Sequence, residues 1–332
     1  MARDVTHRYG DPLDEIWQTS ARRIGFRVER TAEAYAVTHG DGAIRVGTPD
    51  LLDADDGLAQ MILHELCHAL VEGEDAWRLP DWGLCNMTAR DEPREQACLR
   101  LQATLLRPHG LRWVLAPTTD YRSFYDALPD EPLAGDASSV LARIALGRAR
   151  RAPFAPHLED ALAATAAIGR AAGPFADPQS LWSRAEPPPA RHPLGFLAAP
   201  QGSCGGCTWC YRSRGALRCR QADGARLDPS WAACERWEPD LDCQSCGACC
   251  REAYHSVTVP PRDPVVARHP DLVVRRSGYL EILRDGDRCA ALTGTGDRYA
   301  CRIYEDRPRP CRDFTRQSAN CLEARRRVGL SR

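Results

Sequence analysis

The sequence predicts an α+β protein made of two unlike parts: an N-terminal domain of helices around a small sheet, and a small, irregular, metal-stabilised cysteine-rich C-terminal domain. Three observations indicate this organisation. The chain has 332 residues, enough for two domains that each bury a core. Hydrophobic residues in the first 172 positions follow helical spacing in some segments and alternate, as in strands, in others. Thirteen of the sixteen cysteines lie from Cys204 onward.

The predicted N-terminal domain spans residues 1–172. Its strands are short and half-buried, and Gly40 and Gly42 supply a turn between two of them. Its later helices are rich in alanine and leucine. The expected elements are a helix from about residue 12, strands at 26–29, 34–38 and 43–46, and helices at 59–73, 91–107, 136–150 and 157–172.

The helix expected at 59–73 contains the run His64-Glu65-Leu66-Cys67-His68. Residues four apart share one face of a helix, so His64 and His68 can bind one metal ion. Glu65, next to the first ligand, can reach a metal-bound water and act as general base. This HExxH pattern predicts a site for Zn²⁺ or Fe²⁺ with Glu65 as the catalytic residue.

The flanks of this segment support a helix. Apolar residues recur with helical spacing from Leu58 to Val71, and Gly73 provides a C-terminal stop. Aspartate side chains commonly cap helix N-termini by accepting hydrogen bonds from the first free N–H groups. Candidates for this cap are Asp53, Asp55 and Asp56.

The order of a helix, a small sheet and an HExxH helix resembles the minimal fold of the zincin metalloproteases. The resemblance covers about the first hundred residues, and it implies a third ligand from a later helix. Glu95 is the preferred ligand, because the small side chains that follow it allow close approach to the first helix. Glu92 is the alternative, although it precedes Pro93 and can instead favour the helix dipole. Cys67, Cys85 and Cys98 are interpreted as small buried hydrophobic residues.

Residues 173–203 are rich in proline, glycine and serine, and they predict an extended linker. The first cysteine cluster follows, at residues 204–241. Closely spaced cysteines can place two sulfur atoms on one knuckle, and a distant pair can complete a tetrahedral site for zinc or hold an iron–sulfur cluster. One cysteine of the five is spare or shared with the next cluster. They are Cys204, Cys207, Cys210, Cys219 and Cys234.

The second cluster lies in residues 242–332. It opens with Cys243-Gln-Ser-Cys246-Gly-Ala-Cys249-Cys250. Two adjacent cysteines cannot easily face one ion from a regular helix or strand, so this run favours a multi-metal cluster or two neighbouring sites. A hairpin is expected next, with a strand at 279–284 and a turn at 285–287.

The pattern CxxCxxCC, a later cysteine, and then Cys301-Arg-Ile-Tyr-Glu-Asp-Arg-Pro-Arg-Pro-Cys311-Arg-Asp-Phe314 resembles the YkgJ-type cysteine-cluster family. The resemblance covers residues 242–332, with one extra residue before Cys311. It implies chelation of zinc or iron by this domain. The implied ligands are Cys243, Cys246, Cys249, Cys250, Cys289, Cys301 and Cys311, with Cys321 as an eighth candidate.

Composition excludes several classes of function. The chain contains no lysine, so a Schiff base or a lysine nucleophile is excluded. Forty-four basic residues are balanced by 45 acidic ones, and no basic stretch predicts nucleic-acid binding. No targeting segment or membrane span is expected, which predicts a cytoplasmic protein. Clustered cysteines in such a reducing compartment favour metal binding over disulfides.

These observations leave three functions open. The first is a zinc-dependent, peptidase-like hydrolase that acts on a protein or peptide, fused to a zinc- or iron-chelating domain. The second is a non-haem Fe(II) oxygenase or protein hydroxylase that uses His64, His68 and Glu95, with electrons from an iron–sulfur cluster. An HExxH helix followed by the Asp81-Trp82-Gly83 element and a later glutamate resembles the hydroxylase that modifies elongation factor P. The third is a non-enzymatic metal-binding or interaction protein.

Overall fold

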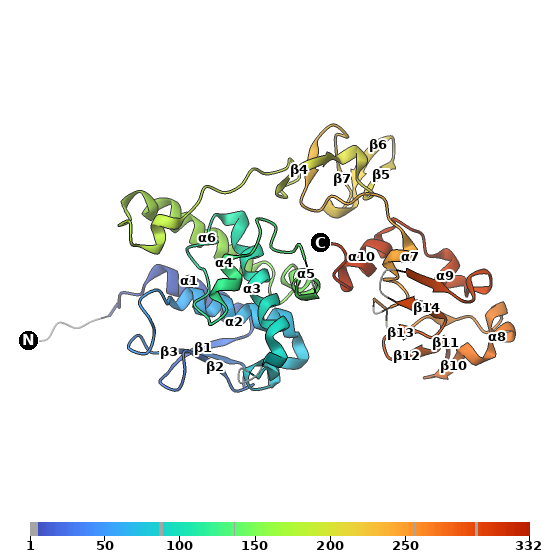
Figure 1. The fold of residues 1–332 in the computed structure, drawn as a ribbon, viewed down its shortest axis with the longest axis horizontal. Helices are drawn as coiled ribbons and strands as arrows, with labels where there is room; N and C mark the ends of the chain where they lie inside the picture. Colours follow the sequence, from blue (N-terminus) through green and yellow to red (C-terminus); the bar gives the residue numbers. More distant parts are fainter. Residues whose placement is uncertain (1–5, 86–88, 136, 252, 255, 296–297) are drawn as a thin grey trace, which may run out of the picture. The chain divides into compact units, whose positions relative to one another are not determined.

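The computed structural model describes residues 6–85, 89–135, 137–251, 253–254, 256–295 and 298–332. The chain divides into two compact units, Met1–Pro189 (unit 1) and Ala190–Arg332 (unit 2). The α+β class is confirmed, because each unit combines helices with small sheets (Figure 1). None of the described helices is long and apolar enough to cross a membrane.

Unit 1 begins with a helix that packs against the later helices, followed by a three-stranded sheet in the order β1-β3-β2. Strand β3 is central, parallel to β1 and antiparallel to β2. The main elements are α1 (Pro12–Ile24), β1 (Arg27–Thr31), β2 (Ala36–Thr38), β3 (Ala43–Gly47), α2 (Leu58–Glu72), α3 (Glu92–Leu106), α4 (Arg122–Asp126), α5 (Ala137–Ala149) and α6 (His157–Ala172).

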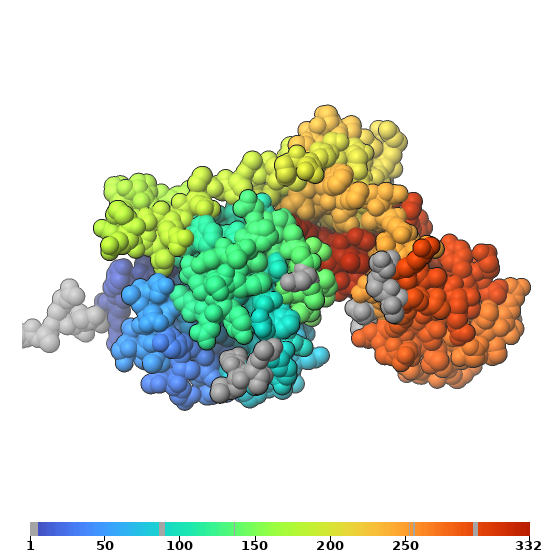
Figure 2. All heavy atoms as spheres, viewed as in Figure 1, coloured from blue at the N-terminus to red at the C-terminus, as the bar shows by residue number. Residues whose placement is uncertain are grey.

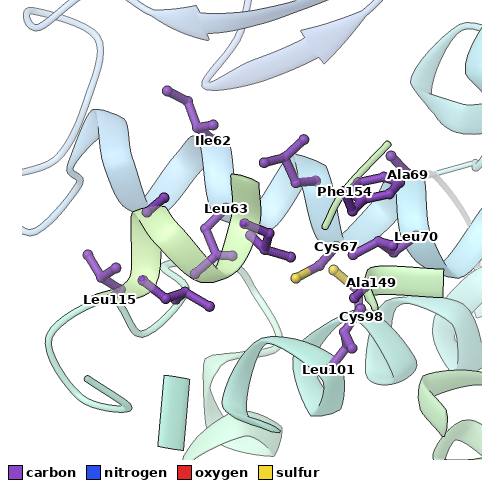
Figure 3. Close-up of a cluster of buried hydrophobic side chains, with 14 of the residues drawn as sticks. Ile62, Leu63, Cys67, Ala69, Leu70, Cys98, Leu101, Leu115, Ala149 and Phe154 are labelled. Atoms are coloured by element: carbon purple, nitrogen blue, oxygen red, sulfur yellow. The ribbon is translucent and has the colours of Figure 1, made fainter. Parts of the chain in front are cut away.

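Helix α2 forms the centre of unit 1. Every residue from Leu58 to Val71 is buried, so this helix is covered on all sides. Helices α1, α3 and α5 pack directly against it. Figure 3 shows Leu63 and Leu70 of α2 in this core, and the sulfur atoms of Cys67 and Cys98 lie close together where α2 meets α3.

The predicted aspartate cap of this helix is wrong. Its N-cap is Gly57, which makes no side-chain capping hydrogen bond. The carboxylate of Asp56 instead accepts hydrogen bonds from the hydroxyl of Thr118 and from the backbone N–H of Asp53. The contact with Thr118 joins residues 62 positions apart, so local sequence does not reveal it.

The C-terminal end of α2 is held by Arg148 of α5. Its Nη1 donates to the carbonyl oxygens of Leu70 and Val71, at 2.6 and 2.8 Å. Such terminal carbonyls have no partner inside their own helix. We expect Arg148→Met to lower the free energy of unfolding by about 1–3 kcal/mol, because buried acceptors are left unpaired. Urea denaturation would measure the change; the exposed Arg23→Met serves as control, and equal effects would contradict this role.

The proline-rich segment 173–203, predicted to be a linker, is divided between the two units. Trp182 packs against the core of unit 1, and the backbone N–H of Glu186 donates to Gly110. Residues from Ala190 onward belong to unit 2. The division therefore follows directly after the run of prolines at 187–189, where the backbone has no N–H to donate.

Unit 2 contains small sheets around small cores, and all its atoms are shown with those of unit 1 in Figure 2. Residues 204–241 and 242–332 share one of these cores, which contains Trp209, Leu241 and Leu322. The elements are β4 (Ala198–Ser203), β5 (Cys210–Ser213), β6 (Ala216–Cys219), β7 (Ala225–Arg226), β8 (Ala232–Cys234), α7 (Cys243–Cys246), β9 (Thr258–Val259), α8 (Pro264–Arg268), β10 (Val273–Arg276), β11 (Tyr279–Ile282), β12 (Arg284–Asp285), β13 (Arg288–Cys289), β14 (Leu292–Thr295), β15 (Arg298–Cys301), α9 (Arg309–Asp313) and α10 (Ala319–Arg327).

The hairpin predicted around residues 279–287 has a different pairing. Strand β11 pairs with β10 before it and with β9, both antiparallel. The turn after Asp285 instead joins β12 to β13. Residues 279–284 are therefore split between two sheets, because Leu283 separates β11 from β12.

Candidate metal centre

Three side chains from two helices converge in unit 1. His64 and His68 lie one turn apart on α2, and their Nε2 atoms are 3.2 Å apart. Glu95, in the first turn of α3, places one carboxylate oxygen 3.6 Å from His64 Nε2 and the other 3.3 Å from His68 Nε2. All three side chains are at most 16% exposed. The two helices therefore bring together the two predicted histidines and the preferred carboxylate.

The spacing of these atoms fits a single metal ion. Bonds of about 2.0–2.1 Å from zinc to nitrogen or oxygen, in a tetrahedral site, place neighbouring ligand atoms about 3.3–3.4 Å apart. The two nitrogens are separated by nearly this distance, and each carboxylate oxygen of Glu95 lies 3.3 or 3.6 Å from one of them. One oxygen of Glu95, Oε1, is buried and has no hydrogen-bond partner among the described residues. An ion between the three groups would satisfy it.

Glu92, the alternative third ligand, has a different partner. Its carboxylate accepts a hydrogen bond from Gln96 Nε2 on the same helix, at 2.9 Å. The geometry thus favours Glu95, which makes the contacts with both histidines.

The proton on His64 is positioned by Gln102 of α3. The backbone carbonyl of Leu115 can only accept, so the amide nitrogen of Gln102 donates to it, at 2.9 Å. The amide oxygen then faces His64 Nδ1 at 3.0 Å, and Nδ1 must carry the proton that it donates. Neutral His64 therefore turns the lone pair of Nε2 toward His68 and Glu95, as a metal ligand requires. Sequence reasoning missed Gln102, although it lies seven residues after Glu95 and so shares its helix face.

Cys98 also lies near the two histidines, and the three side chains have potential ligand atoms within 4.8 Å of one another. Its sulfur is 3.8 Å from His64 Nδ1, however, on the opposite edge of the imidazole from Glu95. That nitrogen carries a proton, as shown above, and cannot bind a metal in the neutral ring. The set with Glu95 is therefore the better metal site, and Cys98 is a fully buried thiol behind it.

The carboxylate of Glu65 is held by Trp82. The indole Nε1–H donates to Glu65 Oε2 at 2.8 Å, and both residues are buried. The backbone of Asp81, Trp82 and Gly83 has positive φ in all three residues, and the Asp81 carboxylate accepts from the backbone N–H of Thr38 in β2. This turn therefore fixes the indole against the predicted general base.

The buried ligands carry perturbed pKa values when no metal is bound. Burial lowers the pKa of His68, but the negative charge of Glu95, with a smaller effect of Glu65, outweighs it and raises the pKa to about 9. Burial raises the pKa of Glu95, but the charge of His68 and its hydrogen bond to the carboxylate, with a smaller effect of His64, outweigh burial and lower the pKa to about 2. His68 and Glu95 thus form an ion pair near neutral pH.

A metal ion must displace the proton from His68, so binding should depend on pH. We expect the affinity for Zn²⁺ to rise about tenfold per pH unit between about pH 6 and about pH 8, because His68 stays protonated up to about 9. Competition with a fluorescent chelator would measure the slope. The zinc bound by His68→Ala, at the same pH values, is subtracted to remove the contribution of the cysteines. If the difference in bound zinc between the two proteins did not change with pH, the ion pair of His68 and Glu95 would be contradicted.

Replacing Gln102 should weaken the site without removing a ligand. We expect Gln102→Leu to lower zinc affinity about 10–100-fold, because His64 loses the partner that sets its tautomer. Gln96→Leu on the same helix is the matched control and should bind zinc normally. Equal affinities of the two variants would show that the hydrogen bond from His64 has no such effect.

The cysteines of residues 242–332 lie near enough to affect one another. Adjacent Cys249 and Cys250 have their sulfur atoms 3.7 Å apart, and this contact lowers the pKa of Cys249 to about 7 while raising that of Cys250. Burial is the main cause that raises the pKa of several further cysteines, and the charge of Cys249 adds to it. The cysteines that Cys249 affects are Cys243, Cys301, Cys311 and Cys321. Cys289 and Cys311 in turn raise the pKa of Cys250, and Cys246 acts on Cys243 and Cys321.

The five cysteines of the first cluster also lie near one another. The charges of the other four all raise the pKa of Cys204, although burial is the larger cause. Among the residues that the structure describes, the cysteines of unit 2 do not form a group of three with sulfur atoms within 4.8 Å. The sulfur atoms would therefore have to approach one another to bind a common metal ion. His192, which the sequence reasoning placed in the linker, lies 3.2 Å from the sulfur of Cys204.

Residues 242–327 match the sequence model of the CxxCxxCC family, described as "Putative zinc- or iron-chelating domain". The match supports the resemblance predicted for the C-terminal part and identifies a metal-binding cysteine domain there. No curated protein and no solved structure matches the chain. The zincin-like fold of unit 1 remains a prediction.

Proposed function

We propose that the protein is a zinc-dependent hydrolase of the peptidase type, in which His64, His68 and Glu95 hold the metal. The observation that carries the proposal is the convergence of two Nε2 atoms and one carboxylate within 3.6 Å. The hydrogen bond from His64 to Gln102 prepares one of these nitrogens for a metal.

Bound zinc would supply a water of lowered pKa and polarise a substrate carbonyl. Glu65, next to His64 on α2, would take the proton of that water as it attacks. Trp82 would hold the carboxylate in one orientation through Oε2 and leave Oε1 free to accept the proton. Burial of all these groups would strengthen their electrostatic effects.

The substrate that best fits this chemistry is a protein or peptide, with the amide carbonyl as the group attacked. The cysteine domain would then bind a partner or position the substrate. Its metal would have a structural role, because the sheets around it are small.

A second candidate is a non-haem Fe(II) oxygenase, since two histidines and one carboxylate also bind Fe²⁺. The hydrogen bond from Trp82 to Glu65 supports it, because Trp82 belongs to the Asp81-Trp82-Gly83 element of the hydroxylase resemblance. Here Glu65 would be a structural acceptor for the indole, and the cysteine domain would supply electrons.

Metal analysis separates the two candidates. The full chain would be purified without oxygen, and its metal content compared with that of His64→Ala. Loss of zinc in the variant would support the hydrolase, and loss of iron the oxygenase. Cleavage of denatured casein by the zinc-loaded full chain would then test hydrolysis directly. If His64→Ala retained the full metal content, neither enzyme proposal would stand.

A further inference from the structure

Helix α10 contributes to two separate cores of unit 2. The first core contains Trp209, and Cys207 of the first cysteine cluster packs against it. Cys246 and Cys249 of the second cluster pack against the other core. The helix residues are Cys321 and Leu322 in the first core and Ala324 and Val328 in the second. One short helix is therefore packed with parts of both clusters.

A turn after α10 brings the chain back onto the helix. The backbone N–H of Leu330 donates to the carbonyl of Arg325, and that of Gly329 donates to the carbonyl of Arg326, at 2.8 and 3.2 Å. Gly329 has a φ of 68°, the left-handed conformation that this capping arrangement requires. The side chain of Arg325 then donates to the buried hydroxyl of Ser331 at 2.9 Å. The chain is thus held against the last turns of α10.

Side chains of residues 317–332, here called the clamp segment, bind beside three of the five cysteines of the first cluster. Each acceptor lies one or two residues after a cysteine, so the contact restrains the backbone that carries the thiol. The donors are Gln317, Arg326 and Arg332, and their respective acceptors are Thr208, Gln221 and Glu235, at 2.7, 2.6 and 2.6 Å. The cysteines that precede these acceptors are Cys207, Cys219 and Cys234.

Two ion pairs join the clamp segment to the first cluster, and both exclude most water. Arg325 lies 2.8 Å from Glu238, and the two side chains are 13% and 17% exposed. Arg332 lies 2.6 Å from Glu235, and these side chains are 10% and 15% exposed. Exposed ion pairs contribute little because water screens them, but loss of one partner from a buried pair leaves an unpaired charge. These pairs therefore favour a single arrangement of α10 against the first cluster.

The core shared by the two clusters contains an unpaired polar group. The ring of Trp209 is fully buried, and its Nε1 has no hydrogen-bond partner in the described part of the chain. A buried N–H without an acceptor is unfavourable. Cys207 and Cys321 bring sulfur atoms to this core, and sulfur can accept a hydrogen bond. The unpaired N–H and the sulfur donors fit a core that surrounds metal-bound thiolates.

We propose that residues 204–241 and 242–332 form one cooperative metal-binding domain, in which the clamp segment couples the two cysteine clusters. Zinc bound by the second cluster orders α10, and the ordered clamp segment holds the cysteine turns of the first cluster in position for a metal. The family match covers residues 242–327, so the first cluster and Arg332 extend this domain on both sides of the matched segment. The coupling does not depend on the function proposed for unit 1.

Zinc titration of the full chain tests the coupling without any mutation. The protein is stripped of metal with a chelator, kept reduced without oxygen, and titrated with Zn²⁺. At each concentration its thiols are alkylated with N-ethylmaleimide and quantified by peptide mass spectrometry. The cysteines of both clusters should become protected over the same range of free zinc. Protection of the two clusters at concentrations more than about tenfold apart would overturn the proposal.

The double variant Arg326→Met/Arg332→Met removes two clamp contacts and no candidate metal ligand. The two protection curves should separate by about 10–100-fold in free zinc, because the first cluster is no longer held by the ordered clamp segment. Arg309→Met is the matched control, because Arg309 forms an exposed ion pair with Asp313 inside α9. Its two curves should coincide as in the wild type. Curves that still coincide in the double variant would show that the clamp segment does not couple the clusters.

The reverse experiment changes the second cluster and observes the first. Cys249→Ser/Cys250→Ser leaves all five cysteines of residues 204–241 in place. Their protection should nevertheless require about 10–100-fold more zinc, because α10 is no longer ordered by the second cluster. Cys85→Ser, a half-buried cysteine of unit 1, is the control and should leave the requirement unchanged. Protection of the first cluster at the wild-type zinc concentration in the double serine variant would contradict the coupling.

Discussion

Glu65→Gln is expected to abolish hydrolysis while the protein keeps its metal. Glutamine has nearly the same shape and can still accept the hydrogen bond from Trp82 through its amide oxygen. It cannot take a proton from water, and loss of a general base typically lowers a rate by about 10²–10⁴-fold. Because His64, His68 and Glu95 are unchanged, zinc content should equal that of the wild type.

The measurement is cleavage of denatured casein by the full chain, with zinc content determined on the same samples. Glu74→Gln is the control, because Glu74 is exposed just beyond the end of the same helix. Unchanged activity in Glu65→Gln would rule out the proposed role of this carboxylate. Activity lost together with zinc would instead show that Glu65 supports the fold of the metal site.

The positions of helices α2 and α3 in the chain could be predicted from local patterns. Gly73 and the apolar spacing located α2, and Pro93 located the first turn of α3, each within about one residue of the observed ends. The preference for Glu95 over Glu92 followed from the small residues after Glu95 and from the position of Glu92 before Pro93. These features depend on residues within one or two turns, which is the range that sequence patterns describe well.

Other features depend on contacts between distant segments and could not be predicted in this way. The acceptor role of Asp56 needs Thr118, and His192, which lies 3.2 Å from the sulfur of Cys204, belongs to a segment expected to be a linker. The Cys98 thiol behind His64 was correctly taken as buried. The charge states of His68 and Glu95 follow from their proximity across two helices, which outweighs the effect of burial and which no local pattern reports. Burial and contacts between distant segments therefore determine these features of the site, and residue spacing alone does not predict them.

Removing metal from the full chain should unfold unit 2 and leave unit 1 folded. Unit 1 has a large apolar core that contains α2 and parts of α1, α3, α5 and α6. The cores of unit 2 are small, and its longest helix has nine residues. A domain with so little buried apolar surface depends on other sources of stability. Structural zinc contributes about 10–16 kcal/mol in small metal-binding domains, which is comparable to the whole stability of a typical protein.

Hydrogen–deuterium exchange with peptide mass spectrometry would measure both units in one sample. After treatment with a chelator, amides of β5, β6 and β14 should exchange much faster, while those of α2 and α3 should keep most of their protection. Unit 1 is the internal control, because loss of the ion held by His64, His68 and Glu95 leaves its hydrophobic core in place. If unit 2 kept its protection without metal, its cysteines would bind metal for a purpose other than folding. An electron-transfer role of the cysteine domain would then gain support. Such a role would favour the oxygenase over the hydrolase, because only the oxygenase requires this domain to change its redox state on a preformed fold.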